Sequence, residues 1–293
     1  MTVTSLREGQ AVAGARLIQH LGSGESGDVW SALSEDGKLV AVKIYSDQEG
    51  AMEKAEHEYH IAKFFSHENL LSPLAMTKHE THPVILLPYC EGRSVDGVAA
   101  NITEVMAWQL AANISNALTE IHGKGYAHFD IKPSNILWDG KKFLLADFGG
   151  CTTTEADKDC CATAADASSF RFDAPERLTH ASAACDIWSL GATIFYLYMG
   201  CHVFNGLGGR AQHKDSPLPY MRKSLPALSE LVRRCLDFEA DKRPSADEIC
   251  AIAQQELQKL SNVHKERKPK PRSEDVTITD NDIFWPEEMV TNN

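Results

Sequence analysis

Hydrophobic and polar residues alternate along short runs in the N-terminal part of the chain, up to about residue 88. Alternation with a period of two is typical of strands that bury one face. The runs with this pattern are 15–21, 29–33, 39–45, 70–74 and 84–88. Glu35-Asp36-Gly37 has the composition of a turn, and the segment 49–66, rich in Ala, Glu and Lys, favours a helix. This part is therefore predicted to be an antiparallel sheet that carries one helix.

After Gly92 the apolar residues recur at helical spacing instead. The clearest stretch is 103–122, which ends at Gly123-Lys124-Gly125 in the way that helices stop. Further helices are predicted over 182–200, 224–236 and 245–260. The pattern as a whole predicts an α+β protein in which a small β-rich part precedes a larger helical part, with the boundary near residue 91.

The end of the chain differs in composition from the rest. Residues 264–272 are basic and interrupted by prolines, and residues 273–293 are acidic, so both are interpreted as a linker and a tail. The tail contains Phe284-Trp285-Pro286. An aromatic pair in an acidic segment is compatible both with docking, on this protein or on a partner, and with plain disorder.

Composition narrows the classes of function. The chain has 293 residues, of which 43% are hydrophobic and 24% charged, as in ordinary soluble globular proteins. Its net charge of −12 repels a phosphate backbone, so nucleic acid is not expected as a partner. The cysteines form no C-x-x-C pair, and neither a signal peptide nor an uninterrupted apolar span is evident. We expect a protein of the reducing cytoplasm that does not enter a membrane.

The first candidate site is the glycine-rich run with Gly22, Gly24 and Gly27. It lies between two predicted strands, whereas a dinucleotide site requires a helix to begin at the motif. A glycine hairpin lets backbone N–H groups approach phosphates. Lys43 follows in the third strand and could reach such a phosphate if a carboxylate held its ammonium; the next helix offers Glu53, Glu56 and Glu58.

A second candidate site combines Asp130, Lys132, Asn135 and, twelve residues later, Asp147. Phosphoryl transfer to an alcohol needs one carboxylate to orient the hydroxyl, and an amide oxygen with a second carboxylate to hold magnesium. The four residues supply these groups in a short stretch of chain.

These motifs resemble those of the eukaryotic-type (Hanks-type) Ser/Thr protein kinase family over roughly residues 14–262. The likeness continues through Ala174-Pro175-Glu176, Asp186-Ile187-Trp188-Ser189-Leu190-Gly191 and Asp241-Lys242-Arg243-Pro244. The resemblance implies a two-lobed protein kinase fold, with an N-lobe over 14–91 and a C-lobe over 92–262. Residues 1–13 would be an N-terminal extension, and 263–293 the linker and tail.

The resemblance also implies how ATP would be held. The residues that match the glycine-rich loop are Gly22, Gly24, Gly27 and Val29. Lys43 matches the lysine that grips the α- and β-phosphates, and its partner would be Glu58, nine residues before His67-Glu68-Asn69. Val29 and Ala41 would lie on one face of adenine and Leu137 on the other, with Leu87 as the gatekeeper. The carbonyl of Pro88 and the N–H of Cys90 would form the hinge hydrogen bonds.

For catalysis, Asp130 matches the aspartate that accepts the hydroxyl proton, and Lys132 the lysine that neutralises the transferring phosphoryl group. Asn135 and Asp147 match the Mg²⁺ ligands. Ser169 stands five residues before Ala174, where Ser/Thr-specific members carry a threonine that bonds the catalytic aspartate and lysine.

Two further matches and one departure complete the comparison with the family. Asp186 matches the aspartate that anchors the catalytic loop, and Arg243 would form an ion pair with Glu176. Phe129 departs from the family, because an arginine is usual before the catalytic aspartate and binds a phosphate on the activation loop. This departure indicates activity without that switch, or another means of ordering the loop.

The resemblance implies an ATP- and Mg²⁺-dependent kinase that phosphorylates Ser or Thr of protein substrates, itself included. Two alternatives stay open: a nucleotide-binding pseudokinase scaffold, and a tyrosine or dual-specificity kinase. A small-molecule phosphotransferase of related fold is disfavoured, because such enzymes generally lack the segments around Glu176, Asp186 and Arg243 that organise a protein-substrate platform.

Overall fold

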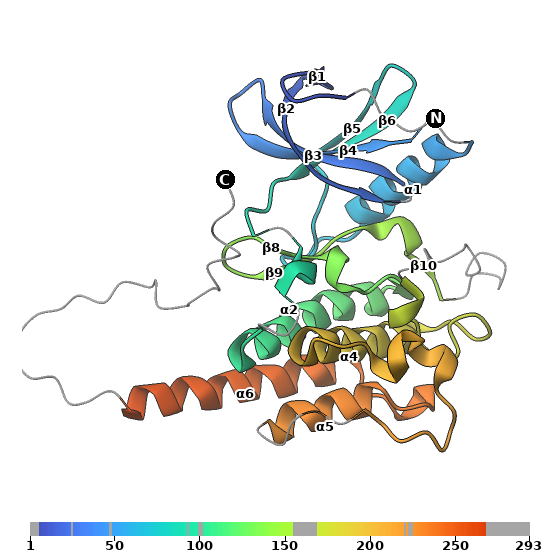
Figure 1. Ribbon diagram of the computed structural model, residues 1–293, viewed down its shortest axis with the longest axis vertical. Coiled ribbons are helices and arrows are strands. Elements are labelled where there is room, and N and C mark those ends of the chain that lie inside the picture. The colour runs from blue at the N-terminus through green and yellow to red at the C-terminus, as the bar shows by residue number, and fades with distance from the viewer. Residues whose placement is uncertain are drawn as a thin grey trace, which may run out of the picture.

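A sheet with one helix packed beside it lies above a larger helical part (Figure 1). The computed structural model describes residues 6–24, 26–46, 49–92, 94–98, 102–154, 169–219, 221 and 225–267. Within these ranges no helix is both long enough and apolar enough to cross a bilayer. The arrangement agrees with the predicted α+β class, while the division into two lobes at residue 91 stays a prediction.

Six antiparallel strands form the main sheet, in the order β1-β2-β3-β4-β6-β5. Their bounds are Ala11–Val12 (β1), Ala15–Gly24 (β2), Gly27–Ser34 (β3), Leu39–Tyr45 (β4), Ala75–His79 (β5) and His82–Pro88 (β6). The predicted turn between β3 and β4 is present, and the Gly37 N–H donates to the Ser34 carbonyl at 2.9 Å. Strand β4 lies inside the sheet, paired with β3 and β6.

Alternate residues of β4 belong to two different clusters, because successive side chains of a strand point to opposite faces. Val40, Val42 and Ile44 are buried in an apolar cluster on one face of the sheet. Lys43 and Tyr45 point to the other face, toward the helix α1. One strand thus supports both the sheet core and a charged group.

Helix α1 spans Ala51–Phe64 and packs one face against β6 and the segment around residue 148. Its buried residues are Ala55, Glu58 and Ala62, spaced as one helical face requires. Ala55 and Ala62 allow the helix to lie close to its neighbours. Glu58 is a carboxylate buried on that otherwise apolar face, so it needs a specific partner.

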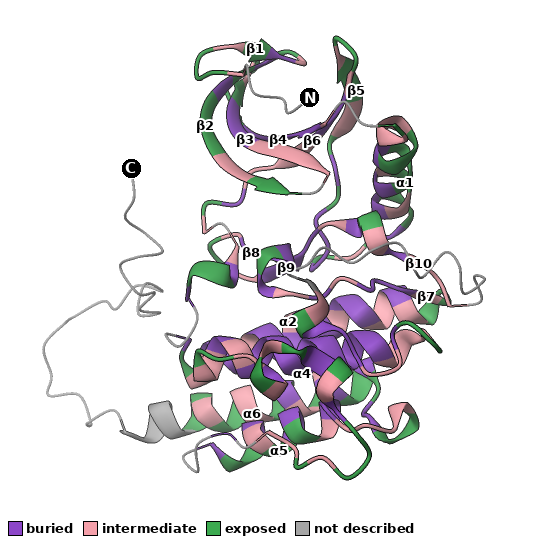
Figure 2. Cartoon of the chain, turned by 45° about the vertical axis from the view of Figure 1, so that its right-hand side comes forward, coloured by how far each residue is buried: buried purple, intermediate pink, exposed green. Residues whose placement is uncertain are grey.

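The helical part is built on α2 and α4. Its helices are Glu104–Gly123 (α2), Ala183–Met199 (α4), Pro226–Cys235 (α5) and Ala246–Arg267 (α6). Figure 2 shows buried residues concentrated in α2 and α4, and the fully buried Trp108 and Trp188 lie in these two helices. Helix α4 is buried on nearly all sides, and its sequence is accordingly apolar almost throughout.

Short elements connect the sheet to these helices. They are the strands Tyr126–Ala127 (β7), Ile136–Trp138 (β8), Phe143–Leu145 (β9) and Thr152–Thr153 (β10), and the 3₁₀ helices Val95–Val98 (η1), Pro133–Asn135 (η2), Phe148–Gly150 (η3), Ser169–Phe172 (η4), Val203–Gly206 (η5), Gly208–Ala211 (η6) and Ala240–Lys242 (η7). Strand β7 pairs with β10 and β8 with β9, both antiparallel. These pairings bring the segments around residues 130 and 147 together.

Two predicted elements need correction. The run 70–74 is not a strand: the strand of this region is β5, at Ala75–His79, and Leu70 makes only an isolated bridge to Leu145. The helix predicted over 245–260 continues to Arg267, so the first residues of the predicted linker are helical. Lys, Glu and Arg favour helices, which is why polarity at this end does not stop α6.

Candidate active site

Lys43 and Glu58 form a buried ion pair between β4 and α1. The distance from Lys43 Nζ to Glu58 Oε2 is 2.6 Å, and the side chains are only 9% and 7% exposed. Lys43 Nζ also lies 3.3 Å from Asp147 Oδ1. Glu58 and Asp147, which were predicted from separate motifs, therefore both contact the ammonium group of Lys43. Lys43 and Asp147 are 104 positions apart in the sequence.

The charges of this cluster support one another. Burial alone would lower the pKa of Lys43, but Asp147 and Glu58 outweigh it and hold that pKa well above its usual value. For Glu58 burial prevails and raises the pKa, although Lys43 opposes it. For Asp147 the burial effect is overcome by Lys43 and Lys132, so its pKa is lowered. The Lys43 side chain is consequently protonated and positively charged at neutral pH.

Asp130, Lys132 and Asn135 form a second group in the loop between β7 and β8. Lys132 Nζ lies 3.0 Å from Asp130 Oδ2. Asn135 Nδ2 donates to the Asp130 carbonyl oxygen at 2.9 Å and to its carboxylate Oδ2 at 2.8 Å. Because the amide nitrogen is committed to Asp130, the Asn135 carboxamide oxygen is left as an acceptor.

Asp186, at the start of α4, fixes the backbone of this loop. Its fully buried carboxylate accepts hydrogen bonds from the N–H groups of His128 at 2.8 Å and Phe129 at 2.7 Å. His122 Nε2 lies 2.9 Å from the same carboxylate. Phe129 has a left-handed backbone, φ 61°, which such anchoring makes tolerable. The anchor predicted for Asp186 is thus present.

Asp147 precedes η3 in a left-handed conformation, φ 64°. Its side chain accepts from the Gly149 N–H at 3.4 Å. The next residue, Phe148, is buried and stacks near Phe65 and His128, at ring-centroid distances of 6.2 and 5.2 Å. Packing of Phe148 therefore holds Asp147 at the surface of the helical part, facing Lys43.

The glycine-rich run forms the hairpin between β2 and β3, with Gly24 paired to Gly27. A Cβ on Gly27, which has φ +146°, would lie 2.0 Å from the Ile44 carbonyl oxygen. Glycine is thus required at this position by close backbone approach. At Gly22 and Gly24 no described atom lies within 4 Å of a built Cβ, so both positions border open space.

The residues predicted to contact adenine come from β3, β4, β6 and β8. Val29 pairs with Lys43, and Ala41 with Leu87, and directly opposite residues point to the same face of an antiparallel pair. Leu87 and Leu137 pack on a cluster that includes Cys90. Burial raises the pKa of the Cys90 thiol to about 11, so it stays neutral. Pro88 ends β6 beside this cluster.

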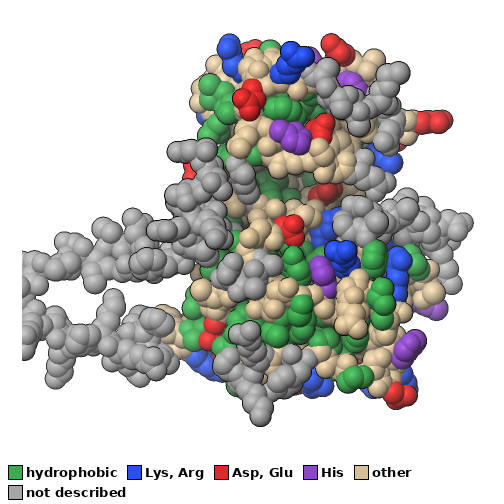
Figure 3. All heavy atoms as spheres, viewed as in Figure 1, with side chains coloured by type: hydrophobic (Ala, Val, Ile, Leu, Met, Phe, Trp, Pro, Cys, Tyr) green, Lys and Arg blue, Asp and Glu red, His purple; other side chains and the backbone are tan. Residues whose placement is uncertain are grey.

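Figure 3 shows acidic and basic side chains gathered where the surface is hollowed between the sheet and the helices.

Comparison with known proteins identifies the family. The family model described as the protein kinase domain matches residues 15–253, which is most of the chain. The chain belongs to the protein kinase domain family. Proteins similar to it include a probable protein kinase of Dictyostelium discoideum, 31% identical over 198 residues, 61% of this chain and 54% of that protein.

Two further relatives are similar over a longer stretch of this kinase. MAP3K epsilon protein kinase 1 of Arabidopsis thaliana is 29% identical over 249 residues, and cytokinesis protein sepH of Aspergillus terreus is 28% identical over 241 residues. Each match covers 78% of this chain but 18% of the relative. The kinase thus spans about half, or less, of the length of these curated relatives.

On the side away from the sheet, the kinase domain joins residues 174–176 to its C-terminal helices. Arg243, whose side chain is fully buried, makes the predicted ion pair with Glu176 at 2.6 and 2.9 Å. It also donates to the carbonyl groups of Ala184 at 2.8 Å and Asp237 at 2.8 Å. Arg243 thereby holds the segment around Glu176 against α4 and the turn before η7.

A contact that the sequence did not predict links this segment to the catalytic loop. The Arg177 guanidinium carbon lies 4.2 Å from the centroid of the Phe129 ring, within the range of a cation–π interaction. Both residues are buried. Phe129 stands where the family usually has an arginine, and its ring is covered by the guanidinium of an arginine from another segment, Arg177. The arginine directly after Ala174-Pro175-Glu176 is the signal that could have been noticed.

One predicted site residue lies partly outside the described structure. The backbone of Ser169 begins η4, but its side chain is not among those described, and neither are residues 155–168. The predicted bond of Ser169 to Asp130 and Lys132 stays a prediction. Residues 268–293, with the aromatic pair of the tail, also lie outside the described residues.

Proposed function

We propose that this kinase transfers the γ-phosphoryl group of ATP, with Mg²⁺, to Ser or Thr hydroxyl groups of proteins, including its own. The observation that carries the proposal is the meeting of Lys43, Glu58 and Asp147 at one buried ammonium, beside the bonded group of Asp130, Lys132 and Asn135. Phosphoryl transfer is catalysed chiefly by positioning and by charge stabilisation, which these two groups supply.

Nucleotide binding is assigned to the face of the sheet that carries Lys43. Val29, Ala41, Leu87 and Leu137 would enclose the adenine ring, with the Pro88 carbonyl accepting and the Cys90 N–H donating hydrogen bonds. The open space at Gly22 and Gly24 leaves room for phosphates beside the hairpin backbone. Lys43 would bind the α- and β-phosphates, and Glu58 would keep its ammonium in place.

Magnesium is assigned to Asn135 and Asp147. Among the described residues, no three His, Cys, Asp or Glu side chains gather into a metal-binding group. Proteins bind Mg²⁺ through one or two carboxylates together with substrate phosphates, so a larger cluster of acidic residues is not required. The carboxamide oxygen of Asn135, which accepts only a long hydrogen bond of 3.5 Å from Ser134 Oγ, and the Asp147 carboxylate, 38% exposed, are oxygen ligands of the required kind. The ion would neutralise phosphate charge.

Transfer itself is assigned to Asp130 and Lys132. Asp130 would accept a hydrogen bond from the attacking hydroxyl and take its proton late in the transfer. Lys132, 3.0 Å from Asp130, would stabilise the charge on the phosphoryl group in flight. Neither residue forms a covalent intermediate in this scheme.

Ser/Thr specificity is proposed from the spacing of two residues. Lys132 stands two positions after Asp130, and Ser169 occupies the position of the threonine in Ser/Thr-specific members. Both features favour serine or threonine over tyrosine as acceptor. Tyrosine or dual specificity remains the alternative, and phosphoamino acid analysis separates them.

We further propose that activity does not depend on phosphorylation of the activation loop. Phe129 cannot bind a phosphate, and the Arg177 guanidinium is instead stacked on its ring. The loop segment after residue 169 is held by other bonds, including Ser189 Oγ to the Phe172 carbonyl oxygen at 2.6 Å. These contacts need no added charge.

Partners and location follow from the family and from the composition of the chain. Protein substrates follow from the family, and the acidic tail with Phe284-Trp285-Pro286 is proposed to dock on a partner or on the kinase itself. The six cysteines among the described residues are free thiols, as expected in the reducing cytoplasm, where we place the protein.

The proposed function is tested by incubating the full chain with Mg²⁺ and ATP and mapping phosphate by mass spectrometry. We expect phosphoserine or phosphothreonine in the wild type and none in Asp147→Asn, which loses a metal ligand but keeps the fold. Nucleotide binding without any transfer would favour the pseudokinase scaffold instead. Undiminished transfer by Asp147→Asn would refute the assignment of Asp147.

A further inference from the structure

Tyr45 is a buried residue of β4 to which the proposed mechanism gives no role. It follows Lys43 by two positions, so strand geometry places both side chains on the same face. The residue is 1% exposed, and its ring packs in a cluster with Ala55 and Ile85. Tyr45 therefore fills the space between the sheet and α1, next to the ion pair.

The Tyr45 hydroxyl reaches Glu58. It donates a hydrogen bond to Glu58 Oε2, the same oxygen that accepts from Lys43 Nζ at 2.6 Å. The Lys43 ammonium also lies 5.3 Å from the centroid of the Tyr45 ring. Burial raises the pKa of the Tyr45 phenol far above its usual value, so the hydroxyl keeps its proton and acts as a donor. Tyr45 thus contacts both members of the ion pair.

Glu58 needs such a donor because of its surroundings. Burial disfavours its ionised form, and hydrogen bonds to that form offset the penalty. The titratable groups that face it are Lys43 and Tyr45 from β4 and Asp147 ahead of η3, of which Asp147 carries the same sign of charge. The Tyr45 hydroxyl is uncharged, so it stabilises the Glu58 carboxylate without attracting the Lys43 ammonium away from it. Two donors on one oxygen also fix the direction of the carboxylate.

We infer that Tyr45 is a positioning residue, which holds Glu58, and through it α1, in the orientation that presents the Lys43 ammonium to nucleotide phosphates. The inference rests on the proposed nucleotide-binding role of Lys43 and deepens it. Tyr45 itself touches no substrate in this arrangement. Its effect passes through Glu58 and should therefore vanish when Glu58 has lost its charge.

The test is Tyr45→Phe in the full chain, which removes one hydroxyl and keeps the ring in its cluster. We expect the affinity for Mg-ATP, measured by calorimetry, to fall about ten-fold, since a hydrogen bond to a buried charged group is lost. We expect kcat/KM for ATP to fall by a similar factor, with part of the loss in KM for ATP, while KM for the protein substrate is unchanged. Merely losing folded protein would lower kcat and leave KM for ATP unaltered.

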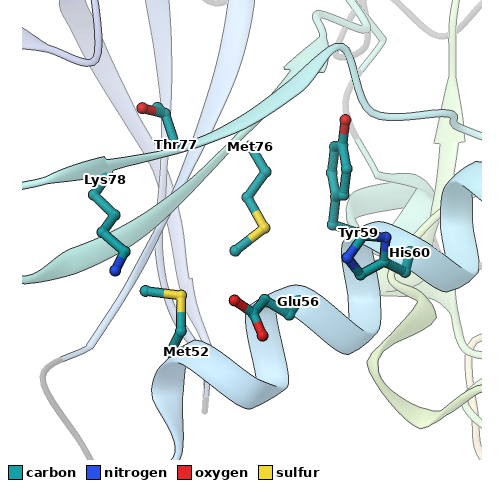
Figure 4. A pocket seen from close by; sticks show the side chains of 7 residues that line it. All are labelled: Met52, Glu56, Tyr59, His60, Met76, Thr77 and Lys78. Atoms are coloured by element: carbon teal, nitrogen blue, oxygen red, sulfur yellow. The ribbon is translucent and has the colours of Figure 1, made fainter.

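Tyr59→Phe is the matched control. Tyr59 directly follows Glu58 in α1 and packs against the same cluster as Tyr45. Its side chain borders an open hollow of about 250 Å³ between α1 and β5, with Met52, Glu56 and Met76 among the lining residues (Figure 4). Removing this hydroxyl should leave the affinity for Mg-ATP within about two-fold of the wild type.

A double-mutant cycle decides whether Tyr45 acts through Glu58. In the Glu58→Gln background the ion pair is already lost, so adding Tyr45→Phe should change the affinity for Mg-ATP less than about two-fold. Unchanged affinity in Tyr45→Phe alone, or an equal loss in the Glu58→Gln background, would overturn the inference. Calorimetry measures binding and needs no turnover. If the wild type bound Mg-ATP without transferring phosphate, the proposed function would be refuted. The comparison of affinities would still decide the role of Tyr45.

Discussion

The two groups of charged residues in this protein kinase domain are assembled in different ways. Asp130, Lys132 and Asn135 lie within six residues of one loop and bond mainly to one another. Lys43 and Glu58 come from a strand and a helix, and Asp147 from a third segment of the chain. The first group is local in sequence, whereas the second exists only if separate elements pack correctly.

The support of the two groups differs accordingly. The loop group is fixed through its backbone by the buried carboxylate of Asp186, which belongs to the densely packed α4. The Lys43 group depends on the side of α1 that carries Glu58, whose packing residues are small alanines, and on the hydrogen bond from Tyr45. Movement of α1 would break the second group and leave the first intact. The loop group should therefore govern chemistry, and the Lys43 group nucleotide affinity.

The largest effect that separates the two groups is expected for Asp130→Asn. An amide cannot take the proton of the attacking hydroxyl, so kcat should fall by about a thousand-fold. The Lys43 group is untouched, so the affinity for Mg-ATP should stay within about two-fold of the wild type. Steady-state kinetics and calorimetry measure the two quantities. A loss of affinity as large as that expected for Tyr45→Phe would show that the groups are not separable.

The anchor of the loop group makes a prediction about stability and pH. Burial alone would raise the pKa of Asp186, but the hydrogen bond and charge of His122 and the bonds from the loop hold it below its usual value. A carboxyl with a lowered pKa stabilises the fold at pH values above its unfolded pKa, and this stabilisation is lost as the pH falls through the folded pKa. Asp186→Asn should therefore lower the free energy of unfolding by about 3 kcal/mol at neutral pH.

The pH dependence distinguishes this cause from a packing defect. The difference between wild type and Asp186→Asn should narrow below about pH 4, where the wild type loses the contribution of Asp186. Denaturant titrations at several pH values measure it. A difference that stays the same at low pH would mean that the charge of Asp186 contributes nothing.

The loop group was within reach of sequence reasoning because it is local. The residue types and the short spacing of Asp130, Lys132 and Asn135 indicate their chemistry. Strand β4 was predicted with its observed bounds because its alternation of apolar and polar residues is regular. The pairing of Lys43 with Glu58 required the family resemblance, since Glu53 and Glu56 on the same helix are equally acidic. Only the packing of α1 selects Glu58 as the buried one.

Other features depend on tertiary contacts that periodicity does not carry. The run 70–74 is apolar enough to predict a strand, but Leu70 and Leu71 are buried, Leu74 is exposed, and the polar edge strand β5 follows the run. Tyr45 could have been placed beside Lys43 from the strand period, but its bond to Glu58 could not. The stacking of Arg177 on Phe129 joins residues 48 positions apart that share no motif.

The smallest expected effect is that of Arg177→Ala, which cuts the link between the loop group and the segment around Glu176. A desolvated cation–π contact is worth about 1 to 2 kcal/mol, so the KM for the protein substrate should rise about five-fold. The affinity for Mg-ATP should not change, because the substitution removes a contact of Phe129 and leaves Lys43, Glu58 and Asp147 themselves as they are. Arg210→Ala is the matched control: its guanidinium stacks 4.9 Å from the Phe170 ring, but the residue is exposed, so a smaller change is expected. Equal changes in the two variants would mean that the Phe129 contact has no special role in holding the substrate side to the catalytic loop.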